Sequence, residues 1–146
     1  MIALACDHGG FELMKGIKAY LDSAGYEYKD FGTYSPESCD YPVVMAPAAQ
    51  AVASGACDNG IFICGTGIGM SIAANKTFGI RAGLCTSCYM AEMTRSHNDA
   101  NVLVLGGRIM DVDLAIEITK VFLTTDFSDK ASHHRRVAML SNMDSK

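Results

Sequence analysis

Five short strand-like segments alternate along the chain with segments whose apolar residues recur at helical spacing. Four of them are apolar runs too short for a core helix, and the other alternates apolar and polar residues, so all five are typical of strands. They cover residues 1–6, 26–32, 60–64, 79–85 and 101–107. Strands that alternate with helices predict a parallel sheet with helices on both faces. The chain is therefore expected to be an α/β protein with a five-stranded parallel sheet.

The segments between these strands carry start and stop signals of helices. Gly25 is placed to end the first helix. Asp40 and Pro42 are placed to begin the second, and Pro47 inside it predicts a kink or a later start. The expected helices cover residues 12–24, about 40–54, 69–77, 87–97, about 114–122 and about 133–143. No repeat or linker divides the chain, so a single domain over residues 1–146 is expected.

Charge and hydropathy argue against several classes of protein. The formal net charge of −4 argues against nucleic-acid binding, which needs a basic surface. No apolar stretch approaches the roughly 18 residues that span a membrane, and Asp7 comes too early for a secretory signal. The cytoplasm is therefore the expected compartment. A small anionic ligand stays compatible with this balance, because a few arginines can hold one phosphate.

The chain has six cysteines, but a disulfide framework is not expected in a chain long enough to bury a core. Cys85 and Cys88 form a C-x-x-C, which is the spacing of redox pairs and of half a zinc site. A structural zinc site needs four ligands, and no second pair completes it, so no metal is expected. We expect Cys85 to end a strand and Cys88 to begin a helix. The alternative is a non-enzymatic thiol sensor that uses these two residues.

The ligands of a parallel α/β sheet bind in a crevice at the carboxyl ends of the strands. The loops expected there are 6–10, 31–40, 64–70, 85–88 and 106–111. The third of them begins "CGTGIGMS", and its glycine spacing matches neither the G-x-G-x-x-G fingerprint nor a P-loop. Its N–H groups and the following helix can hold a phosphate or stabilise an oxyanion. A tight turn that merely needs glycine is the alternative.

Several reactive side chains accompany this loop. Cys64 begins it, and a thiol near a helix N-terminus has a stabilised thiolate, so Cys64 can be a nucleophile or a proton-transferring base. A buried strand cysteine without chemistry is the alternative. Asp7 and His8 follow the first strand and Arg108 follows the fifth, so they are expected at the same edge of the sheet.

Further candidates lie at helix positions. His97 ends the fourth helix, where a histidine is often only a complement to the helix dipole. Arg135 and Arg136 lie on the last helix as either a solvated face or a phosphate site.

One reaction would use all of these candidate residues. A base moves a carbon-bound proton beside a carbonyl, the glycine loop stabilises an enediolate, a histidine opens the sugar ring and arginines hold a phosphate. This is aldose–ketose isomerisation, which needs neither a metal nor an organic cofactor.

The motifs that carry these residues also occur together in a known family. They are "CDHGG", "DFGT", "DYP", "GIFICGTGIGMSIAANK", "GIRA", "SHNDANVLVLGGR" and "RRV", in order from residue 1 to about residue 140. With this set the chain resembles the ribose-5-phosphate isomerase B family. The resemblance implies a Rossmann-like three-layer α/β/α sandwich and interconversion of D-ribose 5-phosphate and D-ribulose 5-phosphate. It also implies a homodimer with active sites shared between subunits, with a tetramer as the alternative.

The resemblance assigns roles to individual residues. Cys64 is the base that moves the proton between C1 and C2, with Thr66 hydrogen-bonded near it. His97, helped by Asp7, opens the furanose ring. The residues implied to stabilise the enediolate through their N–H groups are Gly65, Gly67, Ile68 and Gly69. The implied sugar contacts are Tyr41 and Asn98, and the implied phosphate contacts are His8, Arg108 and Arg136.

One position departs from the family pattern. The family usually carries an arginine four residues before the one that matches Arg136, and here that residue is Ser132. Arg135 and His133 are the candidates to replace it in phosphate contact. Galactose-6-phosphate isomerase is the nearest alternative, but each of its two subunits lacks part of the catalytic set, which is complete here. A pentose phosphate is therefore the expected substrate, with allose 6-phosphate as a side substrate.

Overall fold

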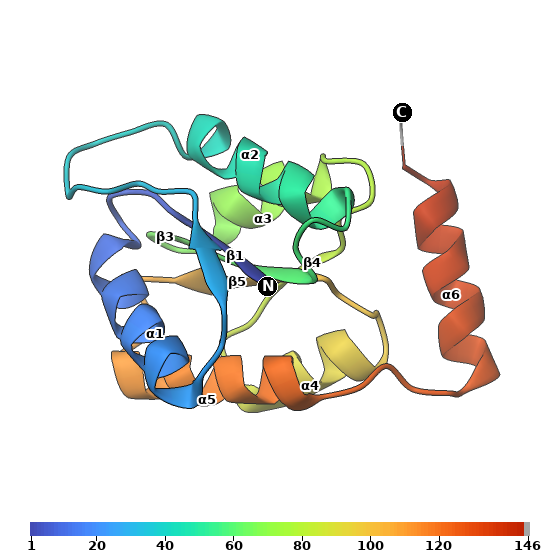
Figure 1. Cartoon of the computed structure of the whole chain (residues 1–146). Helices are drawn as coiled ribbons and strands as arrows, with labels where there is room; N and C mark the ends of the chain where they lie inside the picture. Colours follow the sequence, from blue (N-terminus) through green and yellow to red (C-terminus); the bar gives the residue numbers. More distant parts are fainter. Residues whose placement is uncertain (145–146) are drawn as a thin grey trace.

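The computed structural model of the protein describes residues 1–144 and consists of one parallel sheet with helices on both sides (Figure 1). Strands and helices alternate up to the last two helices. In chain order the elements are β1 (Ile2–Cys6), α1 (Phe11–Ala24), β2 (Tyr28–Asp30), α2 (Tyr41–Ala53), β3 (Asn59–Cys64), α3 (Ile68–Asn75), β4 (Ala82–Leu84), α4 (Cys88–Ser96), β5 (Val102–Gly106), α5 (Val112–Thr124) and α6 (Ala131–Asn142).

All five strands run parallel, in the order β2-β1-β3-β5-β4, so the predicted five-stranded parallel sheet is confirmed. The strands β1 and β5, which flank the central strand β3, are buried at every residue, because helices cover both faces of the sheet. At their carboxyl ends Cys6 pairs with Ile63, and Cys64 pairs with Gly106. The loops that follow β1, β3 and β5 therefore leave the sheet side by side.

Two apolar cores lie on the two faces of the sheet. One face packs against α1, α4 and α5, and residues such as Ile61 and Ile63 of β3 belong to it. The other face packs against α2 and α3 and takes up Phe62 and Cys64. Successive strand residues point to opposite faces, which explains this division. The chain after β3 thus turns toward one face, into α3, while the chains after β1 and β5 turn toward the other.

Some element boundaries differ from the expected ones. The second helix begins at Tyr41 and continues through Pro47, so a later start is wrong. Proline has no N–H, so the Val43 carbonyl lacks its usual helical donor. Both Val43 and Pro47 are exposed, so water can donate to that carbonyl. The strand β2 is only three residues long because it is an edge strand that pairs with β1 alone. The last helix begins two residues before the expected 133.

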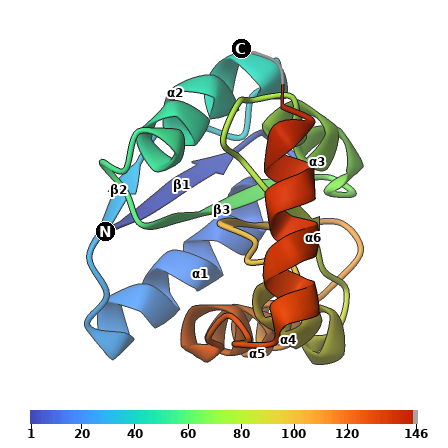
Figure 2. The same cartoon turned by 90° about the vertical axis from the view of Figure 1, so that its right-hand side faces the viewer.

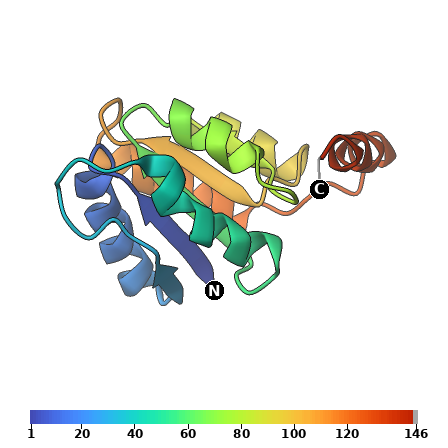
Figure 3. The ribbon, with the colours of Figure 1, turned by 90° about the horizontal axis from the view of Figure 1, so that it is seen from above.

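The last helix, α6, lies beside the three-layer body rather than within it, as Figures 2 and 3 show. No residue of α6 is buried. Its two ends nevertheless contact the body. The imidazole rings of His97 and His133 are 4.1 Å apart, and the Gly79 N–H donates to Asp144 Oδ2 at 3.0 Å. Among residues 1–144 no helix is long and apolar enough to cross a membrane.

Candidate active site

Three loops meet at the carboxyl edge of the sheet and are joined by backbone contacts. The Gly107 N–H donates to the Cys64 carbonyl at 2.8 Å, and the Arg108 N–H donates to the Gly65 carbonyl at 2.9 Å. Gly9 lies against the same loop, since a Cβ on Gly9 would sit 2.8 Å from the Gly65 nitrogen. The three backbones can approach this closely because Gly9, Gly65 and Gly107 carry no side chain. The loops after β1, β3 and β5 therefore form one surface.

Cys64 is the last residue of β3 and is buried on the α2/α3 side of the sheet. The turn after it depends on Gly67, which has φ of +82° and caps the N-terminus of α3. The Ile68 N–H donates to Thr66 Oγ1 at 3.2 Å, so the Thr66 hydroxyl hydrogen is left to donate elsewhere. The first turn of a helix leaves N–H groups without intrahelical acceptors. The thiol thus lies beside a turn that suits a negatively charged oxygen.

The geometry of Gly67 leads to a stability prediction with a matched control. Gly55 has the same φ of +82° but has nothing within 4 Å of an added Cβ, whereas a Cβ on Gly67 would lie 2.5 Å from Leu84 Cδ1. We expect Gly55→Ala to lower the free energy of unfolding by about 1–2 kcal/mol through backbone strain. Gly67→Ala should lower it by about 1–3 kcal/mol more through the steric clash. Urea denaturation at one protein concentration measures both, and equal losses would contradict the close packing of the turn.

Asp7 and His8 follow β1 and have different surroundings. The Asp7 carboxylate is buried, and its Oδ1 accepts hydrogen bonds from the N–H groups of Gly9 at 2.8 Å and Gly10 at 3.1 Å. Asp7 therefore also holds the turn into α1. His8 Nδ1 accepts a hydrogen bond from the Cys39 N–H at 3.3 Å. A ring nitrogen that accepts carries no proton, so the proton of the neutral His8 ring is on Nε2, where it can be donated to a ligand.

Two further predicted residues reach the same edge from other elements. The Tyr41 side chain comes from the start of α2 and covers the first turn of α3, because a Cβ on Gly69 would lie 2.6 Å from the tyrosine hydroxyl. The Arg108 side chain covers the start of the glycine loop, with Nη1 at 3.2 Å from a Cβ on Gly65. A pocket of about 620 Å³ opens between the β1 loop and α2. It is lined by Asp7, His8, Cys39, Asp40, Tyr41, Pro42 and Val43.

Cys39 and Asp40 line this pocket but were not among the residues selected from the sequence. Both lie at the end of the long loop that follows β2, which the parallel-sheet rule had already placed at the carboxyl edge. Their position immediately before Tyr41, a predicted sugar contact, is the sequence feature that could have indicated a place in this pocket.

His97 and Asn98 lie at the opposite edge of the sheet. A helix that joins two parallel strands runs back to their amino ends, so the end of α4 lies where β5 begins. Consistent with this, α6, which contacts His97, stands on the far side of the molecule from the start of α1 (Figure 1). Within one chain the structure therefore does not bring His97 to Cys64 or to Asp7.

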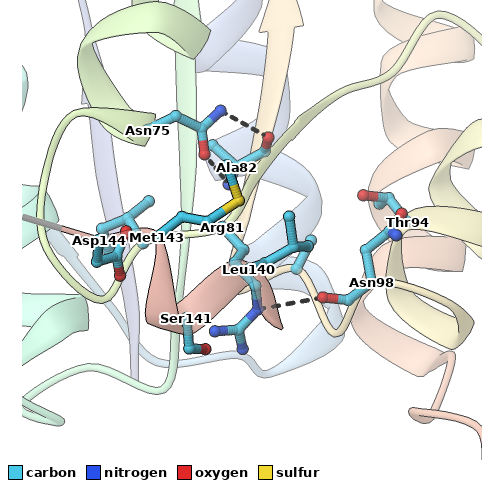
Figure 4. Close-up of a pocket in the computed structure, with 11 residues that line it drawn as sticks. Asn75, Arg81, Ala82, Thr94, Asn98, Leu140, Ser141, Met143 and Asp144 are labelled. Carbon is cyan, nitrogen blue, oxygen red and sulfur yellow. Dashed lines mark hydrogen bonds between the residues drawn. The ribbon is translucent and has the colours of Figure 1, made fainter. Parts of the chain in front are cut away.

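The end of α4 borders a second pocket, of about 370 Å³, between the body and the C-terminal end of α6 (Figure 4). Asn98 lines it, and the Asn98 carbonyl accepts a hydrogen bond from Arg81 Nε at 3.1 Å. Arg81 also donates from Nη2 to the Asp99 carbonyl at 2.9 Å. These bonds hold the short segment between α4 and β5 in place. Leu140, from α6, closes one side of the pocket.

The other predicted residues at this edge lie on the first turns of α6. Arg135 and Arg136 are exposed, and neither forms an ion pair within residues 1–144. Ser132 is partly buried. The His133 ring lies over His97 and its Nδ1 is 2.8 Å from Ser128 Oγ. The two arginines are thus the side chains of this group that are free to meet an anion.

The C-x-x-C cysteines do not have the surroundings of a redox pair. Cys88 begins α4, as expected, whereas β4 ends at Leu84 and Cys85 directly follows it instead of ending the strand; both thiols are free. Burial raises the pKa of Cys85 to about 12. Because the thiolate is the reactive form of cysteine, a buried thiol with a raised pKa is inert. These observations count against the thiol-sensor alternative.

Comparison with known proteins shows what this chain is similar to. The family model described as Ribose/Galactose Isomerase matches residues 2–140. The chain is 44% identical to ribose-5-phosphate isomerase B of Escherichia coli, over 99% of this chain and 97% of the relative. It is 43% identical to the 4-deoxy-4-sulfo-D-erythrose isomerase of a Clostridium species, over 92% of this chain and 86% of the relative.

Solved structures show the same likeness. The ribose-5-phosphate isomerase B of Clostridium thermocellum superposes with a TM-score of 0.94 at 49% identity, over 97% of this chain and 95% of the other. The Thermotoga maritima structure also has a TM-score of 0.94, at 48% identity over 97% of both chains. The fold and these relatives define the class of the protein, an α/β enzyme that acts as an aldose–ketose isomerase. The chain belongs to the ribose/galactose isomerase family.

Proposed function

We propose that the protein interconverts D-ribose 5-phosphate and D-ribulose 5-phosphate through an enediolate, with Cys64 as the proton-transfer base. The observation that carries this proposal is the position of Cys64, at the end of β3 and beside the turn into α3. The name of the Escherichia coli relative and the titles of the solved structures support the choice of a pentose phosphate. The cytoplasm is the compartment we expect for this reaction.

In the proposed reaction the Cys64 thiolate removes the proton from C2 of the open-chain aldose. The electron pair of that C–H bond forms the C1–C2 double bond, and the negative charge moves to the carbonyl oxygen on C1. The N–H groups of the 65–69 loop stabilise this oxygen, because they are already oriented before the charge develops. The thiol then returns the proton to C1, while the hydroxyl proton of O2 moves to O1, and the ketose results. No metal or organic cofactor takes part.

Substrate binding follows from the charges at the two edges. His8 Nε2–H and the Arg108 guanidinium lie at the Cys64 edge and can hold a phosphate, and Arg136 supplies a further guanidinium from α6. Tyr41 and Asn98 are the proposed contacts to the sugar hydroxyls.

The position of His97 requires a second copy of the chain in this proposal. A single chain holds Cys64 and His97 at opposite edges of its sheet, yet ring opening and proton transfer act on the same sugar. A homodimer in which the α4–α6 edge of one subunit covers the carboxyl edge of the other would complete two sites. The exposure of α6 supports such an arrangement, since none of its residues is buried by the described part of the chain, residues 1–144.

Incubation with D-ribose 5-phosphate tests the function directly. We expect D-ribulose 5-phosphate to accumulate to equilibrium without added metal or cofactor, as followed by its absorbance as a ketose derivative or by NMR. Turnover of allose 6-phosphate or galactose 6-phosphate, without turnover of ribose 5-phosphate, would instead support the hexose phosphate alternative. Absence of turnover on all three sugars would contradict the proposal.

A further inference from the structure

His133 is the histidine of α6 whose ring meets a residue at the end of α4, and its Nδ1 is engaged as well. Its ring lies over the His97 ring with centroids 4.1 Å apart and planes inclined by 31°. Its Nδ1 is 2.8 Å from the hydroxyl oxygen of Ser128. Ser128 in turn donates its N–H to the Ser96 carbonyl at 3.0 Å, one residue before His97. A closed loop of contacts therefore joins the end of α4 to the start of α6.

The charges around His133 work against a role in phosphate binding. The pKa of His133 is lowered, first by burial and then by the positive charges of His97, Lys130, Arg136 and His134. Two imidazole rings in contact do not readily both carry a proton. The lowered pKa favours the uncharged form of His133, whereas Arg135 and Arg136 present exposed guanidinium groups. The arginines are better suited than His133 to attract a phosphate.

His97, by contrast, has little else to fix its ring. It caps the C-terminus of α4, is exposed, and has its backbone N–H bonded to the Met93 carbonyl at 2.8 Å. Within residues 1–144 the His97 ring forms no hydrogen bond, and it stacks on the His133 ring. A group that moves a proton must be held within hydrogen-bonding reach and in line with its target, and loss of that orientation slows the reaction.

We infer that His133 is a positioning residue, which holds the His97 imidazole for ring opening through the stack of the two rings and the bond to Ser128. This inference rests on the proposed isomerase function. It replaces the expectation from the sequence that His133 contacts the phosphate. It also gives the two adjacent histidines of α6 different tasks, because His134 stacks on Phe127 at 4.4 Å and does not touch His97.

The kinetic test compares three variants. In His133→Ala the stack is lost, and we expect kcat for ribose 5-phosphate to fall about 10-fold with KM within about twofold of wild type, because orientation is lost and binding is not. His133→Phe keeps an aromatic face over His97 and should recover most of kcat. His134→Ala is the control on the next residue. It removes the contact of His134 Nε2 with the Ser128 carbonyl but keeps the stack on His97, so kcat should fall much less than in His133→Ala. A rise in KM in both His133 variants, with kcat retained, would show a phosphate ligand and overturn the inference.

A second measurement does not depend on activity. The chain has four histidines, so their ring protons can be resolved by NMR. We expect the His97 ring resonances to shift in His133→Ala and to stay in place in His134→Ala. His97→Asn should raise the pKa of His133, because it removes one of the charges that lowers it. Unchanged His97 resonances in His133→Ala would overturn the stack itself. An intact stack in a protein that does not isomerise ribose 5-phosphate would overturn the proposed function instead.

Discussion

Replacing Cys64 by alanine is expected to lower kcat for ribose 5-phosphate by about 10³-fold, which is within the usual contribution of a proton-transferring group. The physical reason is that no other base ends β3 beside the glycine turn. Binding of inorganic phosphate should change little, because the proposed phosphate contacts His8, Arg108 and Arg136 remain. Steady-state kinetics and inhibition by inorganic phosphate measure the two effects separately.

Cys64→Ser provides the closest control for this result. The hydroxyl has nearly the size of the thiol and fills the same buried position, but it does not ionise near neutral pH, so this variant should be as inactive as the alanine variant. Thermal unfolding should show that it folds normally. Near-normal turnover by either variant would show that another group removes the proton.

The second large effect is expected from mixing two inactive variants. Cys64→Ala and His97→Asn are each expected to lose nearly all activity. If each site combines Cys64 of one subunit with His97 of the other, half of the dimers in an equal mixture are mixed, and each holds one intact site. The mixture should then recover about a quarter of the wild-type activity, as expected for random pairing in a symmetric dimer.

The control for this experiment is each variant mixed with itself under the same conditions of exchange. Subunits must be allowed to exchange, which brief exposure to a low urea concentration permits. A mixture that stays as inactive as its components, after exchange has been verified by mass spectrometry of differently tagged chains, would show that the site is not shared in this way.

The sequence pattern predicted most of the fold, because each strand and helix has a local signal. The period of apolar residues identified all five strands, and caps such as Gly25 marked helix ends well. The predicted boundaries were wrong where the surroundings of an element decide its length. The edge strand β2 is shorter than its alternating pattern, since only β1 pairs with it, and α2 runs through Pro47 because that side of the helix faces water.

The site was predictable only in part. The rule that ligands bind at strand carboxyl ends brought Asp7, His8, Cys64 and Arg108 to one edge, and the structure places them there. The rule says nothing about helix ends, so it did not show that His97 lies at the other edge. The rule also does not predict which hydrogen bonds and ring contacts the side chains form. The bonds of the Asp7 carboxylate to the turn, and the stack of His133 on His97, join residues whose contact depends on three-dimensional packing.

By itself the sequence determined the class of fold, the edge of the sheet at which Asp7, His8, Cys64 and Arg108 gather, and the residue types available there. The class of fold follows from the periodicity of apolar residues, which can be seen over a few residues. The edge follows from the direction of the strands, which is common to all parallel sheets of this kind. The tertiary structure decided which of these residues meet. Helices reverse the chain, so residues from adjacent segments come to lie on opposite edges, while α4 and α6 bring His97 and His133 into contact. Contacts between distant segments depend on the packing of the whole chain, and no local pattern encodes them.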